Sequence, residues 1–220
     1  MLPEIGEAGQ ERLRQARVLI VGVGGLGSPV TLYLTAAGVG CLGLVDDDVV
    51  SLSNLQRQVL YSEAEVGAPK VECARRRLSE LNSTTRIETY PTRLTAENAA
   101  ELVANYDLVV DGCDNAATRY LIDEECARQG KPYVYGSIAA FEGQVSVFNY
   151  RGGPRYSDLY PRPAVMPVPQ PGGVVGSIPG LIGCLQASEA IKIIAGCGEV
   201  LSGKLYWTNL LTLQHQIIEL

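Results

Sequence analysis

The first two thirds of the chain alternate between short apolar runs and longer helix-like stretches. Runs rich in Val, Ile and Leu predict strands at 17–22, 41–46, 86–90, 107–111 and 133–135. The longer stretches predict helices at 28–37, 70–81, 96–104 and 115–129, the last with Gly130 as its C-cap. Strands that alternate with helices form a parallel sheet, because each parallel pair needs a crossover connection. The pattern therefore predicts an α/β fold.

The pattern changes after residue 141. Residues 144–150 alternate like an exposed edge strand, 181–195 predict an apolar helix, and 204–220 predict one or two closing strands. Seven of the twelve prolines fall between Pro154 and Pro179, in and just after a predicted loop at 151–173. Dense proline prevents strand pairing, and a loop this long in a compact domain is usually functional or disordered. We expect a lid or a passage for a peptide tail.

Length and charge limit the classes of protein. With 220 residues, 46% of them hydrophobic, the chain can bury one core but is too short for two catalytic domains. The formal net charge is -6, and the arginine run Arg75–Arg77 is interpreted as a solvated helix face. No nucleic-acid partner is expected, because a nucleic-acid footprint is basic.

Targeting and membrane signals are weak. The uncharged stretch 18–45 is interrupted by seven glycines and a proline, so it predicts a buried strand-turn-helix-strand rather than a membrane span. Residues 1–16 lack the basic start and apolar run of a signal peptide, which makes the cytoplasm the expected compartment.

The cysteines and the single histidine argue against several kinds of site. Six cysteines, at 41, 73, 113, 126, 184 and 197, form no CxxC pair, so we predict buried free thiols and no zinc site. His215 lies near the end of the chain and is expected to be a strand residue. A lone histidine there excludes most histidine-based hydrolase and metal schemes.

A glycine motif and an acidic residue indicate a nucleotide. Gly22, Gly24, Gly25 and Gly27 follow a predicted strand and open a helix, where backbone amides can approach phosphate. Alone, the motif also fits a nicotinamide or flavin site, or a packing turn. Asp46 ends the next strand, nineteen residues after Gly27, where a carboxylate can accept hydrogen bonds from ribose.

A polar segment after Asp46 favours a triphosphate over a dinucleotide. The segment runs through Ser53, Asn54, Leu55, Gln56, Arg57 and Gln58. The guanidinium of Arg57 can bind several phosphate oxygens, and Lys70 can add a point charge where negative charge develops at phosphorus. Each of these two residues, taken alone, could equally be a solvated surface residue.

The segment Asp111–Asn115 follows the fourth predicted strand, at the edge where open α/β sheets bind ligands. Asp114 could hold Mg²⁺, because magnesium in phosphate sites often uses one or two carboxylates with the oxygens of the substrate. Alternatively, Asp114 or Asn115 caps the following helix. Both roles can coexist.

Taken together, six blocks of the sequence resemble the ThiF/MoeB/HesA adenylyltransferases, relatives of the ubiquitin-activating enzymes. In chain order the blocks are VGVGGLG, VDDDVVSLSNLQRQ, VGAPKVE, DGCDNAATRY, FEGQVSVF and GCLQASEAIKII. The resemblance covers residues 2–220, and the ordered set of blocks is far more specific than the glycine motif.

The resemblance implies a fold and a reaction. The fold is a Rossmann-like, mainly parallel sheet with helices on both faces, extended by C-terminal antiparallel strands. It implies a single domain over 1–220, with nucleotide binding at about 17–140 and carrier binding at about 141–220. The reaction joins adenylate from ATP to the C-terminal glycine of a ubiquitin-like sulfur carrier ending in Gly-Gly, for thiamine or molybdopterin-type cofactors, in a homodimer.

The resemblance also implies residue roles. Gly25 and its neighbours lie against the nucleotide, Asp46 binds ribose, and 53–57 with Lys70 hold the phosphates. Asp114 and Asn115 complete the part of the site that holds the magnesium ion. The carrier carboxylate attacks the α-phosphorus, so Arg57, Lys70 and Asp114 act by positioning and charge neutralisation rather than as nucleophiles.

Three departures from the family pattern qualify these expectations. An N-terminal RYxRQ segment, whose arginine reaches the ATP of the neighbouring subunit, is missing before LPEIGEAG. The first of two zinc-binding CxxC pairs is replaced by residues 153–158, and the second has no counterpart. The stretch 166–171 lacks the cysteine that joins some relatives to their carrier, and Cys184 is expected to be a packing residue.

Two alternatives remain open. A nicotinamide-dependent oxidoreductase shares the glycine motif and the ribose acid, but it would need a substrate domain and a proton donor that the sequence does not offer. A non-catalytic or heterodimeric relative would keep the nucleotide pocket and lack the N-terminal arginine.

Overall fold

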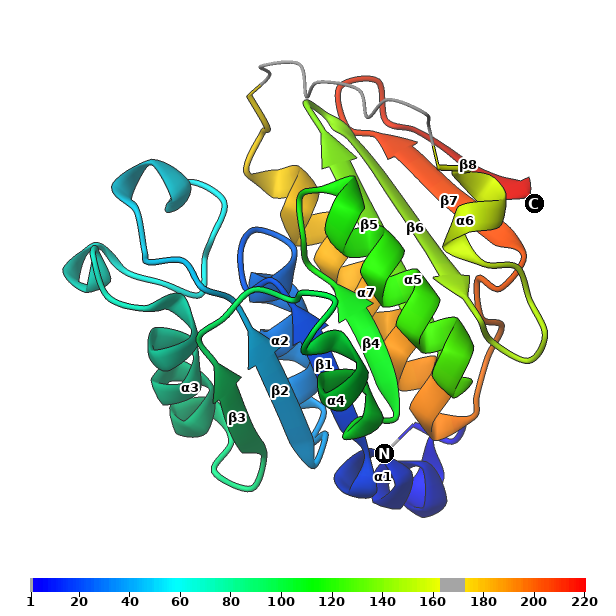
Figure 1. Ribbon diagram of the computed structural model, residues 1–220, viewed down its shortest axis with the longest axis horizontal. Coiled ribbons are helices and arrows are strands. Elements are labelled where there is room, and N and C mark those ends of the chain that lie inside the picture. The colour runs from blue at the N-terminus through cyan, green and yellow to red at the C-terminus, as the bar shows by residue number, and fades with distance from the viewer. Residues whose placement is uncertain (1, 163–172) are drawn as a thin grey trace.

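The computed structural model describes residues 2–162 and 173–220. They form one eight-stranded sheet, in the order β3-β2-β1-β4-β5-β6-β7-β8, with helices on both faces (Figure 1). The strands are β1 (Arg17–Val21), β2 (Cys41–Val45), β3 (Arg86–Tyr90), β4 (Leu108–Asp111), β5 (Tyr133–Ala139), β6 (Glu142–Phe148), β7 (Lys204–Asn209) and β8 (Gln214–Glu219). The α-helices are α1 (Gly6–Gln15), α2 (Gly27–Ala36), α3 (Lys70–Leu81), α4 (Ala99–Ala104), α5 (Ala116–Gln129), α6 (Tyr156–Leu159) and α7 (Ser177–Ala195).

The parallel half of the sheet confirms the prediction from periodicity. β1 to β5 run parallel, and every predicted strand in this half overlaps an observed one. Val21 lies opposite Val45 on one side and Asp111 on the other, so the carboxyl ends of three strands are level. α5 ends at Gly130 in the left-handed region (φ 65°), as predicted for its C-cap.

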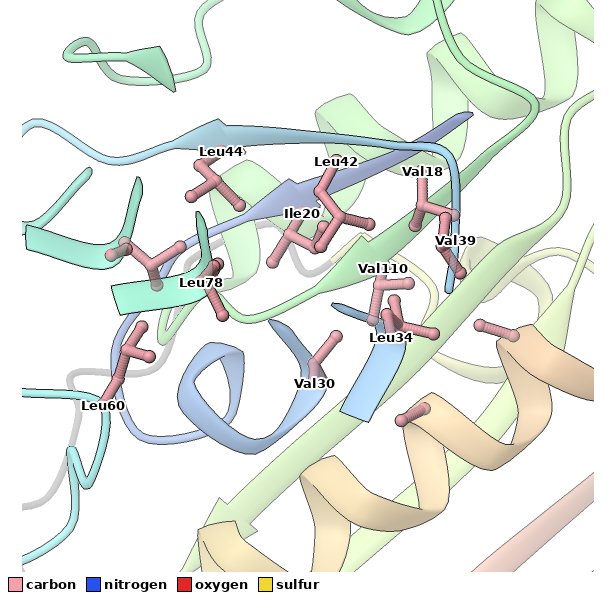
Figure 2. Close-up of a cluster of buried hydrophobic side chains, with 14 of the residues drawn as sticks. Val18, Ile20, Val30, Leu34, Val39, Leu42, Leu44, Leu60, Leu78 and Val110 are labelled. Atoms are coloured by element: carbon pink, nitrogen blue, oxygen red, sulfur yellow. The ribbon is translucent and has the colours of Figure 1, made fainter. Parts of the chain in front are cut away.

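Two apolar layers hold the helices to the sheet. On one face, Val18 and Ile20 of β1 and Leu42 and Leu44 of β2 pack with side chains from α2, α3 and α7 (Figure 2). On the other face, the alternate residues of the same strands, such as Leu19, pack with α4, α5 and α6. Both faces of a parallel sheet are buried in this way, which explains why its strands are continuous apolar runs.

The C-terminal third extends the sheet with antiparallel strands. β5 pairs with β6, β6 with β7, and β7 with β8, which is the edge. The prediction that 144–150 form an exposed edge strand is wrong, because β6 lies between two strands. Two of its polar residues bond to partners inside the fold: Ser146 Oγ donates to the Lys204 carbonyl (2.8 Å), and Gln144 Oε1 accepts from the Tyr160 hydroxyl (2.7 Å).

The predicted C-terminal helix begins four residues early, at Ser177, and Pro179 lies in its first turn, where proline costs no hydrogen bond. Among the described residues, one helix, α7, is long and apolar enough to cross a membrane by length and composition alone. Half of that apolar stretch is buried in the fold, and core helices of soluble proteins pass the same test. Here α7 packs against α2, β5 and β6.

The predicted loop at 151–173 is interrupted by the short helix α6, whose Tyr156 is buried. Residues 163–172, which include the stretch at 166–171 discussed above, lie outside the described residues. α1, before the first predicted element, packs against α7, and Arg12 Nε donates to the Ile194 carbonyl (3.2 Å). Its residues were not assigned to an element by the periodicity.

The side-chain predictions have mixed outcomes. Arg75–Arg77 are exposed on α3, and His215 lies on β8, both as expected. All six cysteines are free, but the expectation that they are buried holds for only three of them. Cys41, Cys73 and Cys126 are buried, whereas Cys113, Cys184 and Cys197 are partly exposed.

Candidate nucleotide-binding site

A cavity of about 760 Å³ opens at the carboxyl ends of β1, β2 and β4. The chain passes from β1 to β2 and β3 on one side of the sheet, and returns to build β4 and β5 on the other. Loops therefore diverge between β1 and β4, which is where open α/β sheets bind their ligands. The residues predicted for the site that line the cavity are Gly22, Gly24, Gly25, Asp46, Gln56, Arg57, Lys70, Asp114 and Asn115.

Four predicted residues do not line the cavity. Ser53 is exposed, and its hydroxyl lies 3.1 Å from that of Ser51. Leu55 packs against the core of the α2 face, and Asn54 lies behind Arg57. Gly27 begins α2 directly behind the glycine loop. These four therefore lie outside the cavity lining.

The glycine loop is built by close approach of main chains. Gly22 has φ +91°, and a Cβ there would lie 2.6 Å from the Gly112 carbonyl oxygen. A Cβ on Gly112 would lie 2.2 Å from the Gly22 carbonyl oxygen, and one on Gly27 would lie 2.1 Å from the same atom. The β1-α2 loop and the loop after β4 therefore approach each other so closely at these positions that only glycine fits.

Asp46 turns toward the glycine loop instead of toward bulk water. Its Oδ2 accepts the Val23 amide (2.9 Å) and its Oδ1 accepts the Asp48 amide (2.9 Å). Two amides fix the carboxylate at the cavity wall, at the end of β2. This is the position from which the acidic residue of a nucleotide fold reaches ribose hydroxyls.

Arg57 and Lys70 bring positive charge to the cavity. Arg57 Nη2 donates to Asn54 Oδ1 (2.8 Å), which orients the guanidinium within its own turn. Lys70 begins α3, its side chain is only 6% exposed, and its Nζ lies 2.7 Å from Asp48 Oδ2. The bond from Lys70 holds the pKa of Asp48 below its ordinary value. Lys70 is thus an oriented, partnered charge and not a solvated surface lysine.

Asn115, and not Asp114, caps α5. Asn115 Oδ1 accepts the Thr118 amide (2.9 Å), so the question left open by the sequence is decided in favour of Asn115. Asp114 is exposed at the cavity, and among the described residues its carboxylate accepts one long bond, 3.4 Å from Asn115 Nδ2. Its oxygens therefore remain available to a ligand.

Asp114 fits the donor chemistry that Mg²⁺ uses beside phosphates, where one or two carboxylates act with the oxygens of the nucleotide. Among residues 2–162 and 173–220, no three His, Cys, Asp or Glu side chains gather to form a metal cluster. A magnesium ion here would need oxygens from the nucleotide as well as from Asp114.

The sequence missed several residues that line the cavity. Arg119 on α5 makes an ion pair with the buried Asp111 (Nε to Oδ2, 3.0 Å), and Arg93, after β3, pairs with Asp47 (2.8 Å). Gln58 stood in the predicted polar segment without a role of its own; it is 4% exposed, and its amide lies against Gly24. One signal was available for Arg119: it stands four residues after Asn115, and so on the same face of the predicted helix.

Comparison with known proteins gives consistent matches over the whole length. The sequence profile of the ThiF family matches residues 1–220. A probable molybdopterin-synthase adenylyltransferase of Porphyra purpurea is 45% identical over 98% of this chain, which spans 58% of that relative. A sulfur carrier protein adenylyltransferase of Thermus thermophilus is 48% identical over 93% of this chain and 79% of its own length.

A solved structure with the same arrangement is that of Escherichia coli MccB. Its TM-score is 0.85 over 96% of this chain and 64% of that one, at 22% sequence identity. At this identity the likeness shows the fold alone. It agrees with the eight-stranded sheet, parallel in its first part and antiparallel in its last.

Proposed function

The chain belongs to the ThiF family, and from this premise we propose that it transfers adenylate from ATP to the C-terminal carboxylate of a ubiquitin-like sulfur-carrier protein. Relatives that are 45% and 48% identical are named as adenylyltransferases, one for molybdopterin synthase and one for a sulfur carrier protein. The product would be an acyl-adenylate that serves thiamine or molybdopterin-type cofactor synthesis.

The observation that carries the proposal is the convergence of separate chain segments on one cavity. A glycine loop after β1, a fixed carboxylate after β2, two cations from 57 and 70, and a free carboxylate after β4 all line it. A nicotinamide site would use the first two features. The cations and the second carboxylate favour a triphosphate with its metal.

In the proposed reaction, a carboxylate oxygen of the carrier attacks the α-phosphorus of ATP. The bond from phosphorus to the bridging oxygen breaks, and pyrophosphate leaves with both electrons of that bond. Arg57 and Lys70 would neutralise the charge that develops on the phosphates, and Asp46 would hold the ribose. Bound Mg²⁺, held by Asp114 and the nucleotide, would supply further charge neutralisation. No side-chain nucleophile is needed.

The proposal assigns the two halves of the chain different partners. Residues at about 17–140 would hold ATP, and residues at about 141–220 would hold the carrier, within one domain. Ser137, Ile138 and Val174 line the end of the cavity next to the antiparallel strands, where the tail of a carrier could enter. Six free thiols suit a reducing compartment, which supports a cytoplasmic location.

We further propose a homodimer whose interface lies on the face formed by α2, α3 and the loop after Arg57. A second, apolar hollow of about 410 Å³ opens there. Tyr33, Val59 and Leu81, which line it, are 54%, 64% and 48% exposed. Val59 stands two residues after Arg57, so a partner seated on this face would adjoin the nucleotide cavity. Exposed apolar patches of this kind commonly mark protein interfaces.

The function is tested by exchange of labelled pyrophosphate into ATP in the presence of a ubiquitin-like carrier that ends in Gly-Gly. The expected result is exchange with the free carrier and none with a carrier whose C-terminal carboxylate is amidated, because adenylation requires that carboxylate. ATP binding without exchange, across carriers for both cofactor types, would instead identify a nucleotide-binding relative without catalysis.

A further inference from the structure

The loop that carries Asp114 rests on a buried ion pair. Arg119 Nε lies 3.0 Å from Asp111 Oδ2, the Asp111 side chain is fully buried, and that of Arg119 is 13% exposed. Asp111 also accepts the Tyr133 hydroxyl (3.0 Å), and its backbone carbonyl accepts Gln186 Nε2 (2.7 Å). Strands β4 and β5 and helix α7 therefore all hold the acid that anchors Arg119.

The guanidinium reaches beyond this acid to the loop itself. Arg119 Nη2 donates to the carbonyls of Cys113 (3.1 Å) and Gly136 (3.2 Å). The Cys113 amide donates to Asp111 Oδ1 (2.9 Å). Both peptide groups of Cys113 are thus held by one ion pair, and the same arginine ties the loop to β5.

These contacts require an arginine. A planar fork can bond a carboxylate and two carbonyls at once, whereas a lysine ammonium is a single point charge. Burial opposes the charged form, but the charge of Asp111 keeps the pKa of Arg119 well above its ordinary value, so the fork stays protonated. The guanidinium also lies 5.4 Å from the centre of the Tyr135 ring, which limits its movement.

Asp114 is held through its neighbours. On one side Cys113 is clamped, and on the other Asn115 caps α5, while the Asp114 side chain itself has only the 3.4 Å bond from Asn115. The backbone on either side therefore fixes the position of the Asp114 Cα, and with it the region that the carboxylate can reach.

We propose that Arg119 is a positioning residue: by clamping Cys113 it places the Asp114 carboxylate at the magnesium side of the cavity and so sets the affinity for the metal that accompanies ATP. The inference rests on the proposed function, because it assumes a metal-nucleotide ligand. The role it assigns to Arg119 is exerted through the loop and does not require contact with ATP or with the carrier carboxylate.

The test measures metal binding without catalysis. Mn²⁺ is titrated into the protein with the α,β-methylene analogue of ATP, without carrier, and free Mn²⁺ is followed by electron paramagnetic resonance. Arg119→Lys, which keeps the charge but not the fork, should weaken Mn²⁺ binding about tenfold, as is usual when a partner that orients a ligand is lost. Arg128→Lys, an exposed arginine on the same helix, should leave it unchanged.

A double-mutant cycle separates positioning from a general loss of structure. Asp114→Ala should weaken Mn²⁺ binding, and adding Arg119→Lys to Asp114→Ala should weaken it no further, because the arginine acts through that carboxylate. The amide of Cys113 should exchange with deuterium at least about tenfold faster in Arg119→Lys, while amides in the core strands keep their protection.

Each outcome decides the inference. Unchanged Mn²⁺ affinity in Arg119→Lys, or additive effects in the cycle, overturns it. If Arg119→Lys does not fold, Asp111→Asn takes its place, since it keeps an acceptor for the Cys113 amide but loses the charge that holds the guanidinium. Because this assay contains no carrier, a failed pyrophosphate exchange would count against adenylation alone and leave the Mn²⁺ result intact.

Discussion

At the residue scale, the cavity holds its cations in prepared positions. Lys70 is paired with Asp48 and Arg57 is oriented by Asn54, so neither side chain has to be ordered when phosphate arrives. Because these charges are already oriented, little free energy is spent on reorganising them when a phosphate binds. Lys70 also lies at the N-terminus of a helix, where free backbone amides favour an anion as well.

Arg57→Ala and Lys70→Ala should each lower carrier-dependent pyrophosphate exchange by about a hundredfold or more, because each removes a partner of the charge on the transferring phosphate. Circular dichroism should show an intact fold, since the Asp48 left behind by Lys70→Ala has a side chain that is 59% exposed. Arg75→Ala, an exposed arginine on the helix of Lys70, is the control. Normal exchange in both cavity variants would rule out their assignment to the phosphates.

The residues that the sequence could identify are those that belong to a local motif. The glycines, Asp46 and Asp114 stand at predicted strand ends, and the topology brings strand ends to one edge. The partners of those residues could not be found in this way. Asp48 meets Lys70 across 22 positions, and Arg119 meets Gly136 across 17, and such pairs depend on how the loops pack.

At the element scale, Glu88 joins three parts of the sheet that are separate in the sequence. Its carboxylate accepts hydrogen bonds from Tyr106 Oη (2.7 Å) and Arg17 Nη2 (3.0 Å) and forms an ion pair with Arg86 Nη2 (2.8 Å), and its side chain is 16% exposed. These contacts connect β3 to β1 and to the turn before β4. Burial would raise the pKa of Glu88, but the bonds from Tyr106 and Arg17 outweigh it and hold the pKa below its ordinary value of 4.5.

Glu88→Gln should lower the free energy of unfolding at pH 7 by on the order of 1–2 kcal/mol, the usual cost of losing hydrogen bonds to a charged group. A carboxylate with a lowered folded-state pKa stabilises the protein above its unfolded pKa and loses that effect as the pH falls through the folded value. The difference between wild type and variant should therefore shrink below about pH 4.5, as measured by urea unfolding.

The control for this experiment is Glu11→Gln, since Glu11 bonds Arg14 and Gln15 of its own helix and its side chain is 48% exposed. It should change stability little at any pH, as is typical of surface pairs. A difference between wild type and Glu88→Gln that stays constant from pH 7 to pH 4 would show that shape, and not charge, explains the effect.

The elements predicted best are those whose two faces are both buried. In β1, β2 and β4, short continuous apolar runs that end at a glycine or a polar residue predicted buried strands, and their bounds were close to correct. β6 was misplaced because alternation has two causes: water on one face, or buried polar partners such as Tyr160 and the Lys204 carbonyl. Periodicity does not distinguish these, since both need a polar residue at every second position.

At the scale of the whole molecule, two surfaces could serve as the interface of a homodimer: the apolar face beside the nucleotide cavity and the exposed edge strand β8. All six residues of β8 are exposed, yet this strand is distant in sheet order from the cavity. The face with Tyr33 and Val59 adjoins the site. The homodimer that we propose would therefore form through that face.

Tyr33→Asp should convert the proposed dimer to a monomer in sedimentation equilibrium, from twice the chain mass of 23.6 kDa to that mass itself, because a carboxylate would be desolvated in an apolar contact. Ile217→Asp, on β8 and 60% exposed, introduces the same charge elsewhere and should leave the dimer intact. A monomeric wild type at micromolar concentration would contradict the assignment of a homodimer.

The touching main chains of Gly22 and Gly112 restrict how this protein can change over time. Since a methyl group at either position would meet the carbonyl of the other, and a carbonyl cannot be trimmed by mutation, no second substitution within the pair can rescue the first. In a library of random variants selected for function, every substitution at Gly22 or Gly112 should therefore be depleted, whichever carrier protein is supplied. Changes in which ligand is bound would then have to come from substitutions at the other residues that line the cavity, while Gly22 and Gly112 stay unchanged.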